Sequence, residues 1–114
     1  MIEPRLASSI QVSAFIRLAE AGGDQAMILR KGDPLSGAIL LVALIKGQTA
    51  CLFERFPSLE DGSIWQPLGD QAAENEQKIT ENWQKRVARD PDLWVVELNV
   101  ASEQRLTLLL TSTS

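Results

Sequence analysis

Apolar positions in residues 8–21 repeat at intervals that fit either a strand or a helix. Ile10, Val12 and Ala14 alternate with polar residues as in a strand, whereas Ile10, Ala14 and Leu18 are four apart as on one face of a helix. A length of about 14 residues suits a helix better than a strand. The pair of glycines directly after the segment is typical of a helix end. The pattern therefore predicts a helix over residues 8–21.

Four segments rich in apolar residues follow, separated by residues that favour turns. They cover residues 26–30, 37–46, 49–56 and 63–68. The second segment contains eight consecutive apolar residues, Ala38–Ile45, which is typical of a strand covered on both faces at the centre of a sheet. Turn residues at 31–34 and 47–48 connect the first three segments. The pattern predicts an antiparallel meander of four strands.

Residues 71–89 are mostly polar and carry one narrow apolar stripe, which predicts a second helix with Asp70 as its N-cap. The stripe consists of Ala72, Ile79, Trp83 and Val87. Pro91 moves Asp90 out of the helical conformation, so the helix ends there. Residues 93–100 predict a fifth strand, which a helical crossover allows to lie parallel to a neighbour inside the sheet. Residues 105–110 predict a short edge strand, and residues 111–114 a frayed tail.

The composition is that of a soluble globular protein with one domain over residues 1–114. The chain is 45% hydrophobic and 23% charged. Its longest apolar run has eight residues, whereas a membrane-spanning helix needs about 20, and no signal peptide is visible. The single cysteine, Cys51, cannot form an internal disulfide. We therefore expect a cytoplasmic protein without a membrane segment, in which Cys51 is buried and structural.

Charge and residue types exclude several classes of function. A net charge of −4, with 11 basic residues scattered among 15 acidic ones, argues against nucleic-acid binding. The chain has no histidine, which excludes Ser-His-Asp and Cys-His nucleophiles and His-ligated zinc. No glycine pattern for binding a phosphate or a dinucleotide occurs. The sequence therefore predicts no catalytic residue, no metal and no cofactor.

The remaining candidate chemistry lies where helices and strands are expected to end. Carboxylates brought together there could hold a divalent cation or perform acid–base work, but we favour the simpler interpretation that they form turns or lie on the solvated surface. An arginine–aspartate network beside a tryptophan could bind an anion or a peptide carboxylate, or could only lock the helix end onto a turn. The candidate ligand-binding residues are Arg30, Asp33, Asp90, Asp92, Trp94 and Glu97; Arg5, Lys31 and Arg89 are further cations that could pair with these acids.

The three tryptophans are the other large features of the sequence. Trp83 lies on the apolar stripe of the second helix, so we expect it in the core. Trp65 and Trp94 lie on short strands near loops. They are either edges of the core or partly exposed anchors for a partner protein.

Three segments of the sequence resemble one family. They are EPRL at residues 3–6, LRKGDPLSGAILL at residues 29–41 and RDPDLWVVEL at residues 89–98. Together they resemble a family of short alphaproteobacterial proteins known only as a domain of unknown function. The resemblance spans nearly the whole chain in order and length, except residues 53–69. It implies a sheet between helices, an α-β-α sandwich, and it brings no activity, cofactor or catalytic residue with it.

The sequence as a whole predicts a single α+β domain, with a mostly antiparallel sheet of about five strands flanked by two helices. The function it favours is an accessory or protein-interaction module without catalytic activity, whose partner is another protein or a second copy of the chain. The alternative is a small-molecule or metal-binding protein, or a carboxylate-based enzyme, that uses the acids at the strand ends.

Overall fold

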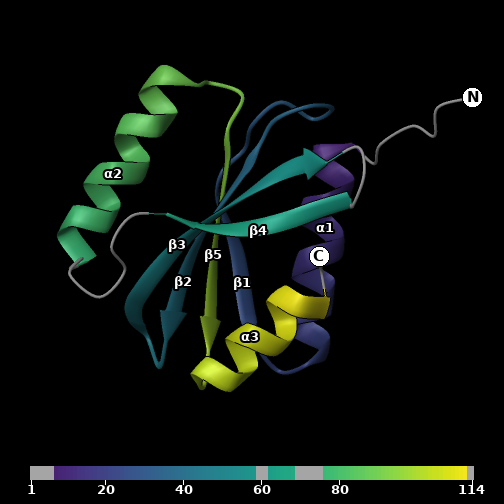
Figure 1. Ribbon diagram of the computed structural model, residues 1–114, viewed down its shortest axis with the longest axis vertical. Coiled ribbons are helices and arrows are strands. Elements are labelled where there is room, and N and C mark those ends of the chain that lie inside the picture. Colours follow the sequence, from purple (N-terminus) through teal and green to yellow (C-terminus); the bar gives the residue numbers. More distant parts are fainter. Residues whose placement is uncertain (1–6, 59–61, 69–75, 113–114) are drawn as a thin grey trace, which may run out of the picture.

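The computed structural model describes residues 7–58, 62–68 and 76–112 and contains three helices and five strands in these ranges (Figure 1). In chain order they are α1 (Ser8–Ala21), β1 (Gln25–Arg30), β2 (Ile39–Ile45), β3 (Gln48–Ser58), β4 (Gly62–Leu68), α2 (Glu76–Arg89), β5 (Trp94–Val100) and α3 (Glu103–Ser112). The α+β class and the five-stranded sheet are as predicted. Arg5, Glu60, Asp61, Asp70 and Ala72 lie outside the described residues, as do the EPRL segment and the predicted start of the second helix.

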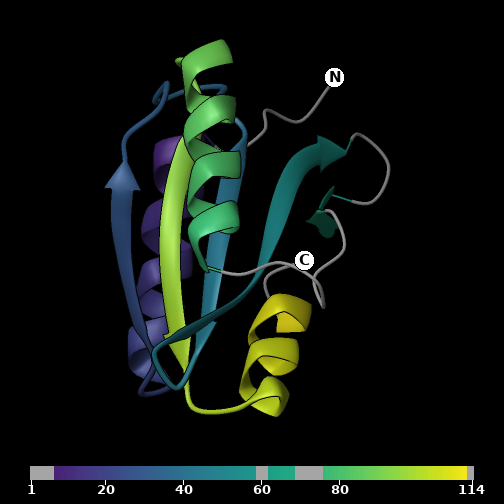
Figure 2. The same ribbon diagram turned by 90° about the vertical axis from the view of Figure 1, so that its left-hand side faces the viewer.

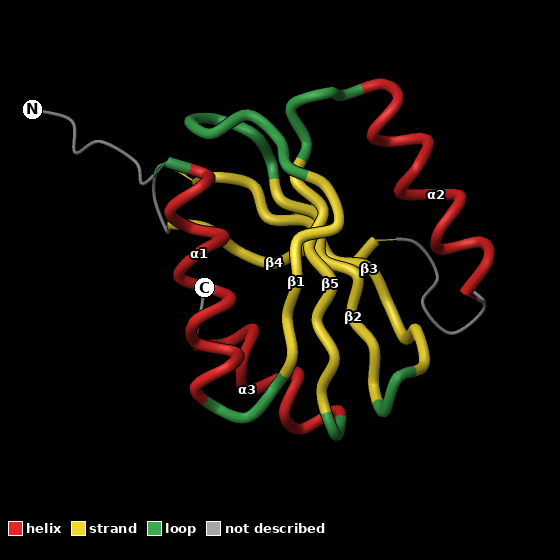
Figure 3. Tube along the Cα trace, turned by 180° about the vertical axis from the view of Figure 1, so that it is seen from behind, coloured by secondary structure: helices red, strands yellow, loops and turns green. Residues whose placement is uncertain are grey.

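The strands form one sheet in the order β1-β5-β2-β3-β4 (Figure 3). β5 lies parallel to β2 and antiparallel to β1, while β2–β3 and β3–β4 are antiparallel pairs. The predicted meander is therefore correct for β2–β4 and wrong for β1, which has β5 rather than β2 as its neighbour. Burial explains the arrangement, because β2 and β5 are the two strands with the most continuous burial and take central positions, whereas β1 is largely exposed.

Helices cover both faces of the sheet, so the α-β-α sandwich implied by the resemblance is confirmed (Figure 2). On one face, α1 and α3 pack against a core that includes Leu41, Val96 and Leu98. On the other face, α2 packs against a core that includes Leu40 and Val95. Neighbouring residues of each central strand alternate between the two cores, as the period of a strand requires.

The first helix covers the predicted residues 8–21, but its buried face does not consist of Ile10, Ala14 and Leu18, the residues four apart from which the helix was predicted. Its buried side chains are Ser8, Val12, Phe15 and Ala19. Ile10 and Leu18 are 54% and 43% exposed and lie on the outer side of the helix. The helix is therefore amphipathic with an additional apolar row on its surface.

The predicted edge strand at residues 105–110 is wrong, because this segment forms helix α3. The Ser102 hydroxyl accepts a hydrogen bond from the Arg105 backbone N–H at 3.2 Å, which is a side-chain N-cap. Leu106 and Leu109, three apart, then face the core on the same side of the helix. The predicted frayed tail begins inside the helix, since Thr111 and Ser112 belong to α3.

None of the helices in the described part of the chain is long and apolar enough to span a membrane.

Candidate functional site

Two loops meet at the end of the sheet where β1 ends and β5 begins. We call this place the loop junction and define it by residues 31–38, residues 90–93 and Trp94. The Asp33 backbone N–H donates to the Asp92 carbonyl oxygen at 3.0 Å, and the Trp94 N–H donates to the Ala38 carbonyl oxygen at 2.9 Å. The Trp94 indole Nε1 donates to the Asp33 carbonyl oxygen at 2.8 Å. Three hydrogen bonds thus join two segments about 60 residues apart in the chain.

The Asp33 carboxylate holds the turn that follows it. Its Oδ2 accepts hydrogen bonds from the backbone N–H groups of Leu35 at 3.1 Å and Ser36 at 2.8 Å, and from the Ser36 hydroxyl at 3.0 Å. This is the local side-chain-to-backbone bonding typical of aspartate in turns. The hydrogen bond from the Ser36 N–H is the largest reason why the pKa of Asp33 lies below its ordinary value of 3.8. Asp33 therefore acts within its own loop.

Two glycines allow the loops to approach at backbone distance. A Cβ atom on Gly32 or on Gly37 would overlap the Asp92 carbonyl oxygen, and on Gly37 it would also lie 3.0 Å from Cδ1 of Trp94. Neither glycine has a positive φ angle. These positions therefore need glycine because there is no room for a side chain, and the requirement lies in the packing of the two loops.

The first loop also caps the N-terminus of α1. The backbone N–H groups of Ser8 and Ser9 donate to the carbonyl oxygens of Leu35 at 3.3 Å and Pro34 at 3.0 Å. The Ser8 hydroxyl, which is buried, donates to the Gly37 carbonyl oxygen at 2.6 Å. The first N–H groups of a helix have no partner inside the helix, so these loop carbonyls satisfy them. The loop junction therefore joins β1, β2, β5 and α1.

Arg30 and Asp90 contribute to the same junction. Arg30 Nη2 donates to the Pro91 carbonyl oxygen at 3.2 Å, and the Asp90 carboxylate accepts from the Asp92 backbone N–H at 3.1 Å. The Asp92 side chain is exposed and makes no hydrogen bond to a described residue. Of the six candidate residues, the structure therefore brings five together around these loops.

Glu97 is the candidate that stands apart. It lies three residues after Trp94, about 10 Å along the strand. It pairs across the sheet with Met27 and Val42, and Val42 belongs to the core on the α2 side, whereas Trp94 belongs to the core on the α1 side. A site that uses Glu97 together with Asp33 and Asp92 is therefore not formed.

The tryptophans and Cys51 are arranged for packing. Trp94 and Trp65 are 4% and 8% exposed, so the suggestion that they are partly exposed anchors is wrong. Trp65 contacts the ring of Phe15 with a centroid distance of 5.4 Å, which links β4 to α1. Cys51 is buried, as expected, and burial raises the pKa of its thiol to about 11, with a smaller contribution from Glu103. The thiol therefore stays protonated and unreactive near neutral pH.

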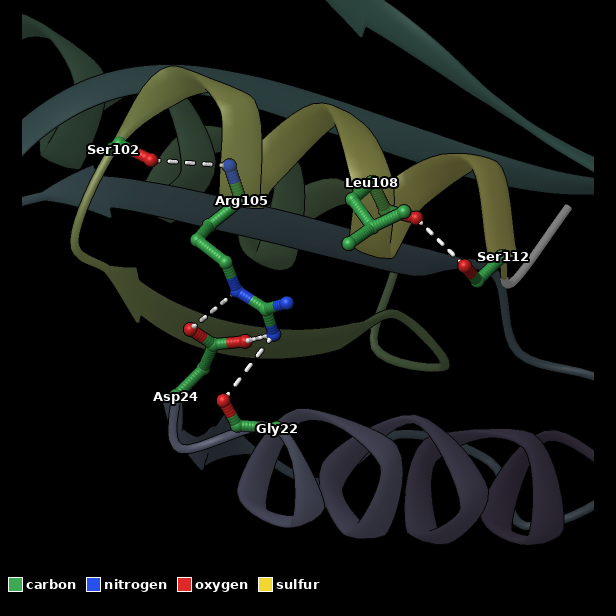
Figure 4. A network of polar contacts seen from close by, with 6 residues as sticks. All are labelled: Gly22, Asp24, Ser102, Arg105, Leu108 and Ser112. Carbon is green, nitrogen blue, oxygen red and sulfur yellow. Dashed lines mark hydrogen bonds and ion pairs between the residues drawn. The ribbon is translucent and has the colours of Figure 1, made fainter.

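Two ion pairs with buried carboxylates were not predicted from the sequence. Asp24, at the start of β1, is buried and accepts hydrogen bonds from Nη2 of Arg105 at 2.6 Å and from its Nε at 3.5 Å (Figure 4). Arg105 Nη2 also lies 3.4 Å from the Gly22 carbonyl oxygen, and its pKa is raised chiefly by the hydrogen bond to Asp24. The pair was missed because the Arg105 segment was predicted to be a strand.

The second pair joins α2 to the sheet. Glu54 of β3 is 2% exposed, and both of its carboxylate oxygens contact Arg86 Nη2, Oε2 at 2.6 Å. A signal for it exists in the sequence. Glu54 lies two residues after the buried Leu52 and therefore on the same face of β3, and Arg86 lies three residues after Trp83, next to the apolar stripe of α2. Opposite charges at inward positions of two neighbouring elements predict such a pair.

Two surface hollows in the described part of the chain lie away from the loop junction. They measure about 650 and 490 Å³ and lie along α3, and their described lining residues include none of the six candidates. Within residues 7–58, 62–68 and 76–112, no group of three or more His, Cys, Asp or Glu side chains is placed to hold a metal ion. What the junction does present is Leu35, a large apolar side chain that is 76% exposed at the tip of the first loop.

Comparison with known proteins identifies the family of the chain. A family model described as "Protein of unknown function (DUF1491)" matches residues 6–108, which include both loops of the junction. The chain belongs to the DUF1491 family. This confirms the resemblance to short alphaproteobacterial proteins of unknown function, because solved structures of DUF1491 proteins come from such bacteria. No match was found among the curated proteins.

Three solved structures show how well the DUF1491 fold is retained. A crystal structure of a DUF1491 family protein from Caulobacter crescentus CB15 is 36% identical, with a TM-score of 0.68, and the match covers 82% of this chain and 87% of that one. An NMR structure of a DUF1491 family protein from the same organism is 32% identical, with a TM-score of 0.70 and coverage of 90% and 89%. A solution structure of a protein from A. tumefaciens is 27% identical, with a TM-score of 0.70 and coverage of 94% and 93%.

The role of Asp33 in this DUF1491 protein can be tested by its pH dependence. The lowered pKa means that Asp33 adds stability above its ordinary pKa of 3.8, and that this stability is lost as the pH falls through the lower pKa of the folded state. We expect Asp33→Ala to lower the melting temperature at neutral pH, and the difference from wild type to shrink as the pH falls below 3.8. Thermal unfolding followed by circular dichroism measures both.

Asp92→Ala is the matched control for loss of an exposed carboxylate in the same junction, since the Asp92 side chain has no hydrogen-bond partner among the described residues. A melting temperature of Asp33→Ala equal to that of Asp92→Ala at neutral pH would show that the turn does not depend on the Asp33 carboxylate.

Proposed function

We propose that this DUF1491 protein is a cytoplasmic accessory protein that acts by binding another protein and has no catalytic activity of its own. The observation that carries the proposal is the position of Leu35. It is the most exposed of the large hydrophobic residues in the described part of the chain, at 76%, and it lies on a loop held from several sides. Binding residues often lie on loops that a rigid scaffold holds in place.

The rigidity of this loop comes from bonds on both sides of Leu35. Its own N–H is bound by the Asp33 carboxylate and its carbonyl oxygen by the Ser8 N–H. Gly37, two residues later, packs directly against the Asp92 carbonyl. Because the backbone of this loop is already ordered, the loop would lose little conformational entropy when a partner binds over Leu35. The Leu35 side chain itself contributes to none of these bonds.

The charges around Leu35 favour a protein partner over nucleic acid. The loop junction itself, residues 31–38 and 90–93, contains three acids, Asp33, Asp90 and Asp92, and one cation, Lys31, and the whole chain carries a net charge of −4. Phosphate binding depends on clustered Lys and Arg. A site that used these acids to bind a metal or a small molecule is less well supported, because the Asp33 and Asp90 carboxylates already bind backbone N–H groups of their own loops.

The proposal is tested by exchanging Leu35 for a charged residue. Tagged wild-type protein is produced in cells that make it naturally, its contacts are trapped by a short chemical crosslinker, and the crosslinked proteins are identified. We expect Leu35→Asp to abolish a crosslink that the wild type forms. We expect Leu108→Asp to retain it, because Leu108 is similarly exposed, at 55%, but lies on α3. Both variants should melt at the temperature of the wild type, since neither side chain is in the core.

Two results would overturn this function. One is a crosslinking pattern of Leu35→Asp equal to that of the wild type. The other is a wild-type protein that forms no specific crosslink at any stage of growth.

A further inference from the structure

We propose that β1 is the contact surface of a homodimer, in which the β1 strands of two copies pair antiparallel about a two-fold axis and join the two sheets. The surface does not include Leu35, so the inference goes beyond the proposed function and stands separately from it. The argument rests on the exposure of β1, the pattern of its side chains and the charges at its two ends.

β1 is an edge strand whose outer side is not covered by another element. It pairs with β5 alone in the described sheet, and it forms one outer margin of the molecule in Figure 2. In such a strand every second residue directs its N–H and C=O groups away from the sheet. These groups are placed to bind the backbone of a further strand, as in β-augmentation.

The side chains of β1 do little to prevent such pairing. Natural edge strands are usually protected by charges, proline, bulges or a covering helix. From Gln25 to Leu29 the strand has neither a charge nor a proline, and its irregularity comes only after Ile28. The opposite edge of the sheet differs, because β4 contains Pro67, which cannot donate a backbone hydrogen bond. β1 therefore carries its one charge, Arg30, and its irregularity only at its C-terminal end, whereas β4 contains a proline.

Two apolar side chains of β1 are exposed and would be covered in the dimer. Met27 is 54% exposed and faces the α2 side of the sheet, opposite Glu97. Ile28 is 36% exposed and faces the α1 side, opposite Val96. A two-fold axis perpendicular to the sheet keeps each side chain on its own face, so opposed residues must belong to the same face. The register with Met27 opposite Met27 of the second copy satisfies this condition.

The charges at the ends of β1 favour a second copy as the occupant. Glu20, at the end of α1, precedes the strand, and Arg30 and Lys31 end it. Glu20 and Lys31 are both exposed, and no ion pair of either is seen among the described residues. Antiparallel pairing about a two-fold axis places the basic end of one β1 beside the acidic end of the other, twice in each dimer. The strand is thus complementary in charge to itself in this orientation.

The first experiment measures association by sedimentation of the purified protein over a range of concentrations. We expect a monomer–dimer equilibrium. Met27→Lys places two like charges opposite each other, so it should weaken the dimer by more than about tenfold. Met27→Leu keeps an apolar side chain and should leave the dimer intact. Leu108→Lys, on the exposed side of α3, is the control for a new surface charge and should have no effect.

The second experiment tests the antiparallel arrangement by exchanging charges. Glu20→Lys and Lys31→Glu should each weaken the dimer by roughly 2- to 30-fold, because each removes two exposed ion pairs per dimer. The double variant Glu20→Lys/Lys31→Glu should restore wild-type association, since the pairs re-form with reversed signs. All of these positions are exposed, so the variants should fold as the wild type does.

A wild-type protein that stays monomeric up to about 1 mM would overturn the homodimer. A dimer that Met27→Lys leaves unchanged would place the contact elsewhere on the surface and overturn it as well. Failure of the double charge exchange to restore association would contradict the antiparallel arrangement. None of these variants alters Leu35, so the outcome is independent of the test of the proposed function.

Discussion

Replacing Gly37 with alanine should lower the free energy of unfolding by about 3 kcal/mol, at the upper end of the range for overpacked positions. The Cβ atom would overlap the Asp92 carbonyl oxygen and lie 3.0 Å from Cδ1 of Trp94. Neither neighbour can give way easily, because one is backbone and the other belongs to a side chain that is 4% exposed. The two loops would have to separate, which would also strain the hydrogen bond from Trp94 Nε1 to Asp33. Urea denaturation measures the change.

Gly47→Ala is the matched control, because Gly47 is needed for its backbone conformation, whereas Gly37 is needed for lack of space. Its φ angle is +80°, and a Cβ atom there would meet nothing within 4 Å. Alanine at this position should cost about 1–2 kcal/mol through backbone strain alone. Gly37 has a φ angle that alanine can adopt, but the neighbouring loop leaves no space for a Cβ atom. If Gly37→Ala were as stable as the wild type, the loops would be able to move apart without loss, and the loop junction would not be the rigid element described above.

Removing Arg86, which joins α2 to the sheet, should lower the free energy of unfolding by an amount similar to that expected for Gly37→Ala. Arg86→Ala leaves the Glu54 carboxylate, which is 2% exposed, without its counter-ion, and breaking such a pair typically costs about 3–5 kcal/mol. Because Arg86 is itself about one-third exposed, the lower end of this range is expected. Urea denaturation of the wild type and the variant at pH 7 measures the loss.

Two further variants separate the ion pair from helix α2 as a whole. Arg89→Ala removes an exposed arginine one turn later in the same helix and should change stability by less than about 0.5 kcal/mol. The double variant Glu54→Leu/Arg86→Met replaces both charges by apolar groups and should recover most of the loss. If Arg86→Ala cost no more than Arg89→Ala, Glu54 would have to be stabilised by solvent or by another group.

The parts of the fold that followed from the sequence are those with a strong local signal. The helix over residues 8–21, the continuous apolar run of β2 and the strand after Pro91 were predicted from periodicity and turn residues, and the structure contains all three. The position of β1 was not predicted, because the sheet order depends on which strands are covered on both faces. α3 was misjudged because Leu106, Leu109 and Leu110 fit a short strand until the Ser102 cap is recognised.

The candidate site was predicted in part for the same reason. Arg30, Asp33, Asp90, Asp92 and Trp94 lie at the ends of predicted elements, and the parallel pairing of β2 and β5 brings their loops together. These residues are joined mainly by hydrogen bonds to backbone groups, and residue types alone do not predict such bonds. Glu97 was grouped with them by sequence proximity, but the alternation of strand faces separates it. Leu35 had no signal in the sequence, since exposure of an apolar residue is visible only in the fold.

The insertion of β5 between β1 and β2 has a consequence for the order in which this protein can assemble. β1 has no neighbour in the sheet until residues 94–100 have been synthesised, although it is the first strand of the chain. β2, β3 and β4 can pair beforehand through local contacts, but one edge of β2 stays open until then. Contacts between segments so distant in sequence form slowly. The sheet is therefore completed only when β5, from the C-terminal part of the chain, pairs with β1 and β2. Until β5 has been synthesised, the open edges of β1 and β2 can aggregate with other chains.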